Sequence, residues 1–174
     1  MIHYKTEEEI KLMKESCRLA AEVLLMIEPY VKPGVTTERL NQICHNYIVV
    51  KGAVPSPLNY RGFPKSICSS VNEEICHGIP SDRKLRNGDI VNLDITTYLN
   101  GFHGDTSRTF FVGSPRKKAA KLVEVCKEAL QRGIEVVKPG AKLGDIGATI
   151  QNFAESHGYS IVREFCGHGI GANF

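Results

Sequence analysis

The sequence predicts a mixed α/β fold in which helices cover an antiparallel sheet. Four separate stretches carry apolar residues at helical spacing. A fifth alternates apolar and polar residues on either side of Asn100-Gly101, which is the strongest short-range signal for a β-hairpin. The order of helices also repeats along the chain. We therefore expect a single domain over residues 1–174, made of two related halves at about 1–113 and 114–174.

Length and composition exclude several classes of protein. The chain has 174 residues, of which 42% are hydrophobic and 24% are charged, as in ordinary globular proteins. No apolar run approaches the roughly 18 residues that cross a bilayer. The first nine residues are polar and acidic, unlike a secretory signal, so we expect a cytoplasmic protein with no membrane partner. The net charge is +3, but the positive residues are mostly interleaved with negative ones, apart from Arg116-Lys117-Lys118. The sequence therefore predicts no specific nucleic-acid partner.

The cysteines are scattered, and no two have the Cys-x-x-Cys spacing of a zinc or redox site. Several fall within apolar stripes of the expected helices. We therefore expect buried free thiols rather than disulfides. They are Cys17, Cys44, Cys68, Cys76, Cys126 and Cys166.

The helices of the first half have recognisable ends. Thr6 and Glu9 form a capping-box pattern, which predicts a helix from there to about residue 27. Lys32-Pro33-Gly34 breaks the chain, Thr36 or Thr37 can cap a second helix, and a glycine near residue 52 ends it. A loop rich in proline and glycine follows, and then a strand at 66–71.

The second half repeats this order. Val31-Lys32-Pro33-Gly34 recurs as Val137-Lys138-Pro139-Gly140, after a helix predicted at about 116–137 and before another across 146–153. A predicted strand at 161–165 then leads to His168-Gly169-Ile170, as His77-Gly78-Ile79 follows the first pair of helices. Two unrelated helix pairs sharing a Pro-Gly break are the alternative, and the recurring His-Gly-Ile favours duplication.

The predicted hairpin places two acidic residues on one face of the sheet. If Asn100-Gly101 is the turn, Asp94 lies opposite Ser107 and Asp105 opposite Thr96. The two carboxylates are then diagonal neighbours, roughly 7 to 8 Å apart. Such a pair can bind shared cations. Alternatively this is only a polar solvent face, and a bulge near Gly104 would change the register.

Two histidines strengthen the metal hypothesis. His77 and His168 both lie beside glycines, which allow close approach of backbone and ligand. A structural, hydrogen-bonded histidine is the alternative at each position. Their equivalent places in the repeat suggest two walls of one cleft. Oxygen and nitrogen donors together fit Mn, Fe, Co or Zn.

Several motifs occur in a fixed order along the chain. They are Tyr60 to Cys68, Asn72-Glu73, Cys76 to Pro80, Gly88 to Asp94, Gly101 to Ser107 and Gly167 to Gly171. With these motifs the sequence resembles type I methionine aminopeptidases of peptidase family M24 over its whole length, and the resemblance implies the pseudo-symmetric "pita-bread" fold. It also implies a chain truncated at the C-terminus, because the family continues with a histidine and two glutamates.

The resemblance implies a role for each matching residue. Asp94 would chelate one metal ion, Asp105 would bridge two, and His168 would bind the other. His77 would act as a catalytic residue that contacts the substrate near the scissile bond. The residues that would line the pocket for the methionine side chain of the substrate are Tyr60, Phe63, Cys68 and Phe174. Pro57 stands where many members have a cysteine, which leaves that part of the pocket open.

The resemblance also implies a reaction. Two divalent ions (Co, Mn, Fe or Zn) would support removal of N-terminal methionine from nascent proteins whose second residue is small. Peptide and nascent-protein N-termini are the expected partners, the ribosome is a further candidate, and the full-length protein is expected to be a monomer. With three of five ligands, we expect little or no activity from these 174 residues alone. The alternatives are a non-catalytic pita-bread relative that binds RNA or protein, and an Xaa-Pro aminopeptidase-like hydrolase.

Overall fold

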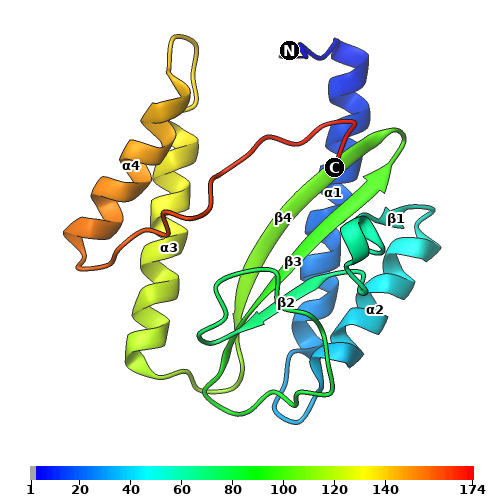
Figure 1. Cartoon of the computed structure of the whole chain (residues 1–174), viewed down its shortest axis with the longest axis vertical. Helices are drawn as coiled ribbons and strands as arrows, with labels where there is room; N and C mark the ends of the chain where they lie inside the picture. Colours follow the sequence, from blue (N-terminus) through cyan, green and yellow to red (C-terminus); the bar gives the residue numbers. More distant parts are fainter. Residues whose placement is uncertain (1–2) are drawn as a thin grey trace. The chain divides into compact units, whose positions relative to one another are not determined.

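The computed structural model describes residues 3–174 (Figure 1). They form two compact units: the chain up to Pro115 together with Ile170–Phe174, and Arg116–Gly169. Within residues 3–174, no helix has the length and apolarity that crossing a membrane requires. The first unit contains α1 (Glu7–Ile27), η1 (Glu28–Tyr30), α2 (Thr37–Val50), β1 (Val54–Pro55), η2 (Tyr60–Gly62), β2 (Cys68–Val71), β3 (Ile90–Leu99) and β4 (Phe102–Phe111). The second contains α3 (Lys117–Glu135) and α4 (Leu143–Ser156).

The predicted capping box begins α1. The Thr6 hydroxyl accepts a hydrogen bond from the Glu9 amide at 3.2 Å, and the Glu9 carboxylate accepts one from the Thr6 amide at 2.7 Å. Two amides that the helix leaves without partners are thereby satisfied. At α2, the Thr36 hydroxyl caps the helix by accepting a hydrogen bond from the Arg39 amide at 3.1 Å. Both predicted starts are confirmed.

The sheet is antiparallel, with β3 at its centre. β1 and β2 pair with successive parts of β3 along one edge, and β4 pairs with the other edge. The register is continuous along the hairpin, with Asp94 opposite Ser107, Thr96 opposite Asp105 and Thr97 opposite Gly104. The predicted register is therefore confirmed, and no bulge interrupts it. The two residues of β1 were not predicted.

The helices α1 and α2 cover the face of the sheet that carries the odd-numbered residues of β3. Val91, Leu93 and Ile95 are fully buried against these helices, while Asn92 and Asp94 lie on the opposite face. The hydrophobic effect thus fixes which face of the hairpin remains available for polar chemistry.

A close contact joins α1 to the hairpin. Ser16 is fully buried; its hydroxyl donates to the Thr97 carbonyl at 3.0 Å, and the Thr97 hydroxyl donates to the Ser16 carbonyl at 3.0 Å. Gly104 lies against the same turn, where a Cβ atom would overlap the backbone of Ser16 and Cys17. The absence of a side chain at Gly104 is what allows this approach.

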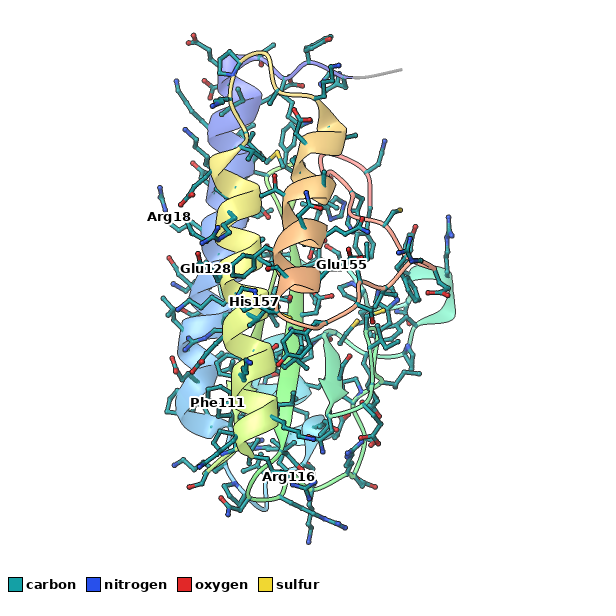
Figure 2. The ribbon with its side chains drawn as sticks, turned by 90° about the vertical axis from the view of Figure 1, so that its left-hand side faces the viewer. Arg18, Phe111, Arg116, Glu128, Glu155 and His157 are labelled. Carbon is teal, nitrogen blue, oxygen red and sulfur yellow. The ribbon has the colours of Figure 1, made fainter. Side chains whose placement is uncertain are left out.

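The helices α3 and α4 pack against each other in the second unit (Figure 2). Gly133 lets Ile150 approach closely, and the Arg132 guanidinium lies 4.3 Å from the centroid of the Phe153 ring. The predicted helices are confirmed. The strand predicted at 161–165 is wrong: these residues form no strand and are largely exposed. A strand needs a neighbouring backbone, and residues 3–174 supply no ladder partner here.

The pH dependence of stability has an identifiable source in Asp89. Its carboxylate accepts hydrogen bonds from the Asn72 amide group at 2.9 Å and the Arg86 backbone amide at 2.8 Å. Partial burial raises the pKa of Asp89, but these hydrogen bonds outweigh it and hold the pKa below the usual 3.8. The folded state therefore favours the ionised form, and this stabilisation is lost as pH falls from about 4 through the lowered pKa.

We expect Asp89→Asn to destabilise the protein by about 1 kcal/mol at pH 7 and by less at pH 3, where the native carboxyl is also becoming protonated. Urea unfolding at both pH values measures the difference. The exposed Asp82, changed to asparagine, is the control and should show no such pH dependence. An equal penalty for Asp89→Asn at both pH values would contradict the assignment.

Candidate metal and peptide site

Three of the predicted site residues meet on neighbouring strands. Cys68 of β2 lies directly opposite Asp94 of β3, and Asp105 of β4 is the diagonal neighbour of Asp94 across the hairpin. The Thr96 hydroxyl donates to an Asp105 carboxylate oxygen at 3.1 Å. Because Thr96 is buried, this bond restricts the orientation of the carboxylate. The pleat of the sheet thus brings two carboxylates and a thiol to one face.

The thiol of Cys68 is a poor metal ligand in this setting. Burial, chiefly, and the nearby Asp94, Cys76 and Asp105 raise the pKa of Cys68 to about 12. The thiol therefore remains protonated and neutral near pH 7. This behaviour is consistent with an apolar pocket wall, the role that the resemblance implies.

All six cysteines are free, as predicted, but only Cys44 and Cys68 are buried. The expectation that all are buried is wrong for the other four, because helix stripes and loops leave one side open to solvent. Burial also raises the pKa of Cys44 to about 12.

We expect a disulfide reagent at pH 8 to titrate the four exposed thiols in the native protein and all six in urea. The Cys44→Ser protein retains five cysteines. If all five reacted rapidly in the native state, the buried Cys68 would be accessible and the prediction would be contradicted. The exposed thiols are Cys17, Cys76, Cys126 and Cys166.

The loop between β1 and β2 carries two further predicted residues, Tyr60 and Phe63. It closes on itself, since the Asn59 amide donates to the Phe63 carbonyl at 2.8 Å and the Phe63 amide to the Tyr60 carbonyl at 2.9 Å. The turn uses left-handed backbone at Asn59, Arg61 and Gly62. The Tyr60 ring meets the Phe174 ring at a centroid distance of 4.5 Å. Two predicted pocket residues, 114 positions apart in sequence, are therefore in contact.

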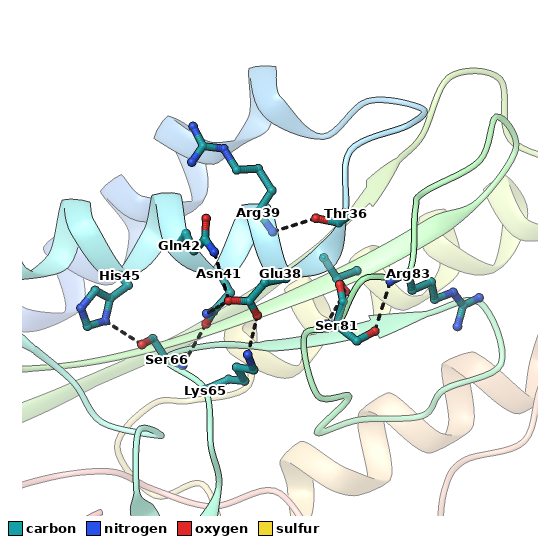
Figure 3. A network of polar contacts seen from close by, with 11 residues as sticks. Thr36, Glu38, Arg39, Asn41, Gln42, His45, Lys65, Ser66, Ser81 and Arg83 are labelled. Carbon is teal, nitrogen blue, oxygen red and sulfur yellow. Dashed lines mark hydrogen bonds and ion pairs between the residues drawn. The ribbon is translucent and has the colours of Figure 1, made fainter.

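A polar network from α2 holds the end of this loop (Figure 3). The Ser66 amide donates to the Asn41 side-chain oxygen at 2.9 Å, and Nδ1 of His45 lies 2.8 Å from the Ser66 hydroxyl. Lys65 forms an ion pair with Glu38 at 2.7 Å, and the Glu38 oxygen that it meets is buried. Beside this network lies a hollow of about 340 Å³ lined by α2, Leu58 and residues 64–66. The network fixes the loop where it enters β2.

His77 lies in a constrained stretch beside β2. Its backbone is left-handed, with φ of 55°, which costs a non-glycine residue about 1 kcal/mol. Gly78 follows, and its amide donates to the Ser70 hydroxyl at 3.1 Å while its carbonyl accepts from the Ser69 amide at 2.8 Å. A Cβ atom at Gly78 would overlap the Ser69 carbonyl. Strained backbone of this kind is common at functional sites.

His168 belongs to the second unit, where Nδ1 of its ring lies 3.0 Å from the Gly169 carbonyl. Within residues 3–174, no three His, Cys, Asp or Glu side chains group as a metal site. The Asp94 and Asp105 pair does offer the carboxylate donors that divalent ions prefer. The metal-binding roles of Asp94, Asp105 and His168 stay predictions, as does the catalytic role of His77.

His103 is a residue that the sequence reasoning missed. It lies two residues from Asp105 on the same strand, and therefore on the same face of the hairpin. Its side chain is buried, and its Nδ1 lies 2.8 Å from the Ser56 hydroxyl. Burial lowers the pKa of His103, while the charge of Asp105 opposes that shift. The alternation of the strand could have identified it, because His103 and Asp105 are separated by one residue.

Comparison with known proteins shows the family to which this chain belongs. The sequence matches metallopeptidase family M24 over residues 11–174. The chain belongs to metallopeptidase family M24. It is 54% identical over 173 residues to a methionine aminopeptidase of Rickettsia prowazekii, covering 99% of this chain and 67% of that protein. The methionine aminopeptidase of Escherichia coli K12 is also 54% identical, over 175 residues, with 99% and 66% covered.

A solved structure agrees. The crystal structure of the Rickettsia prowazekii methionine aminopeptidase superposes with a TM-score of 0.98 at 55% identity, covering all of this chain and 70% of that one. The M24 chain thus has the pita-bread fold predicted for it. It spans about two thirds of the length of the methionine aminopeptidases it matches.

Proposed function

We propose that this M24 chain forms part of a methionine aminopeptidase, which hydrolyses the first peptide bond of proteins that begin with methionine and a small second residue. The observation that carries the proposal is the hairpin register, which places Asp94 and Asp105 as diagonal neighbours on one face. The identity to proteins named methionine aminopeptidase supports the choice of substrate. A cytoplasmic location and nascent chains as partners, at the ribosome, belong to the same proposal.

Asp94 and Asp105 would hold two divalent cations (Co, Mn, Fe or Zn), with His168 as a further ligand. When bound, such ions supply positive charge that polarises a peptide carbonyl and makes water more acidic. The chain's own contribution to this chemistry is positional. The Thr96 hydroxyl donates to one Asp105 carboxylate oxygen and so restricts the rotation of that carboxylate. His77 is the candidate for contacting the substrate carbonyl. The hydrogen bonds of the adjacent Gly78 to β2 hold its backbone in place.

The remaining predicted residues suit the methionine side chain. Tyr60 and Phe174 offer touching aromatic rings, and Cys68 offers a neutral buried thiol. A flexible thioether gains from contact with aromatic rings, and an apolar pocket without a counter-charge rejects charged side chains. Phe63, half-buried in the same loop, is the fourth wall residue.

Turnover by the 174 residues alone is proposed to be low, because the resemblance implies five ligands and three match here. Hydrolysis of Met-Ala-Ser with added Mn²⁺ or Co²⁺ tests this. We expect little free methionine from the chain by itself. Robust release of methionine that is abolished by Asp105→Asn would overturn the low-activity proposal and support the reaction.

Metal binding tests the carboxylate pair independently of turnover. Titration calorimetry with Mn²⁺ should show binding that Asp94→Asn and Asp105→Asn each weaken by at least about tenfold, because each removes a charged ligand. Asp82→Asn, an exposed acid in a loop, is the matched control and should bind as the native chain does. Equal affinity in all four proteins would contradict the site. In the hydrolysis assay, cleavage of a peptide beginning Ala-Pro in preference to Met-Ala-Ser would instead identify an Xaa-Pro hydrolase.

A further inference from the structure

His103 lies at the centre of an aromatic cluster in the first unit. The cluster consists of Tyr60, Tyr98, His103 and Phe174. The His103 ring stacks on Phe174, with centroids 5.4 Å apart and planes at 28°, and meets Tyr98 at 4.7 Å. Phe174 in turn meets Tyr60 at 4.5 Å. His103 and Tyr98 have no role in the proposed reaction, whereas Tyr60 and Phe174 are candidate walls of the methionine pocket.

Polar contacts fix the position of His103. Its Nδ1 lies 2.8 Å from the Ser56 hydroxyl, and Ser56 is itself tied to the sheet, since its amide donates to the Thr96 carbonyl at 3.0 Å. The His103 amide donates to the Gly171 carbonyl at 2.8 Å. One residue therefore contacts the loop after β1 through its ring and the segment Ile170–Phe174 through its backbone.

These contacts make the placement of Phe174 depend on His103. Phe174 is 38% exposed, so the core does not enclose it. The Phe174 ring contacts the rings of His103 and Tyr60. Stacked and tilted aromatic pairs add stabilisation beyond area burial and restrict the relative position of the rings. His103 therefore supplies the fixed surface against which Phe174 can face Tyr60.

We propose that His103 is a positioning residue for the methionine pocket, holding Phe174 against Tyr60 and so setting the space available to an unbranched thioether side chain. The inference rests on the proposed function, since it takes the Tyr60 and Phe174 contact as a pocket wall. His103 acts through Phe174 and does not touch the substrate. The ring and the Ser56 hydrogen bond make separable contributions.

Two substitutions separate these contributions. His103→Asn keeps a polar atom close to the position of Nδ1 and can retain the bond to Ser56, but it removes the ring. His103→Phe keeps a ring for stacking and loses the hydrogen bond. The matched control is His157→Asn, at the exposed end of α4 in the second unit. Tyr60→Ala removes a pocket wall directly.

The probe is L-methionine amide labelled with carbon-13 in its methyl group, and the readout is the methyl NMR signal on titration with the chain. Aromatic walls should move this signal upfield in the native protein. We expect His103→Asn to weaken binding about tenfold, as loss of a well-placed aromatic contact does, and to remove most of the upfield shift. His103→Phe should retain part of both effects, and His157→Asn all of both.

The outcomes separate the two proposals. No binding of the probe by the native chain removes the proposed pocket itself. Binding and upfield shift that disappear in Tyr60→Ala but persist unchanged in both His103 variants overturn the positioning role and leave the pocket standing. Thermal unfolding of each protein shows whether it is folded. If both His103 variants unfold, Ser56→Ala provides the test, because it leaves every ring intact. It must weaken binding of the probe for the inference to stand.

Discussion

Replacing Gly104 with alanine is expected to lower the free energy of unfolding by about 3 kcal/mol, at the upper end of what overpacking costs. The added Cβ would overlap backbone atoms of Ser16 and Cys17. Backbone cannot rotate away as a flexible side chain can, so α1 has to shift away from the hairpin. That shift also breaks the paired hydrogen bonds between Ser16 and Thr97.

Urea unfolding followed by circular dichroism measures this change. Gly147→Ala is the matched control, because Gly147 lies within α4 and an added Cβ there would meet no other group within 4 Å. Alanine there should raise the stability of the helix by about 0.5 to 1 kcal/mol. A Gly104→Ala protein as stable as the native chain would show that α1 and β4 do not approach each other closely at this point.

The hairpin and the helices were predictable because local chemistry specifies them. Asn100-Gly101 fixes a two-residue turn, and alternation with a period of two then assigns every side chain to a face. The sequence alone therefore places Asp94 and Asp105 together. Thr6 and Thr36 likewise mark helix starts through bonds to amides three residues away.

Other features depend on residues far away in sequence. β1 exists because Val54 and Pro55 lie opposite Tyr98 and Thr97, more than 40 positions later, and a Pro-rich loop carries no local strand signal. Residues 161–165 have a strand-like composition but no ladder partner among residues 3–174. Pairing, which strands require, is not encoded within the strand itself.

The candidate site shows the same division. Register alone gave the face shared by Asp94 and Asp105, and it also contained the position of His103. The contact of Phe174 with Tyr60 and His103 could not be derived in this way, because it joins residues from a loop, a strand and the segment Ile170–Phe174. The resemblance supplied the grouping of Tyr60 with Phe174, and the structure supplied His103.

Gly78→Ala should have the second large effect, and it should act on the candidate site as well as on stability. The Cβ would overlap the Ser69 carbonyl, which belongs to the backbone of β2 and cannot rotate away. We expect a loss of about 2 to 3 kcal/mol of unfolding free energy. Because Gly78 carries two hydrogen bonds to β2, the preceding His77 must move with it.

The displacement of His77 gives this variant a test that stability alone does not provide. The ring protons of His77 can be assigned by comparison with His77→Asn, and their NMR shifts should change in Gly78→Ala while those of His157 stay constant. Gly167→Ala, whose added Cβ would meet no other group within 4 Å, is the control and should leave both unchanged. If Gly78→Ala loses stability but keeps the His77 signals, the backbone bonds to β2 do not position that histidine. A shift confined to His77 would show that the packing of one glycine against β2 determines where a candidate catalytic side chain stands.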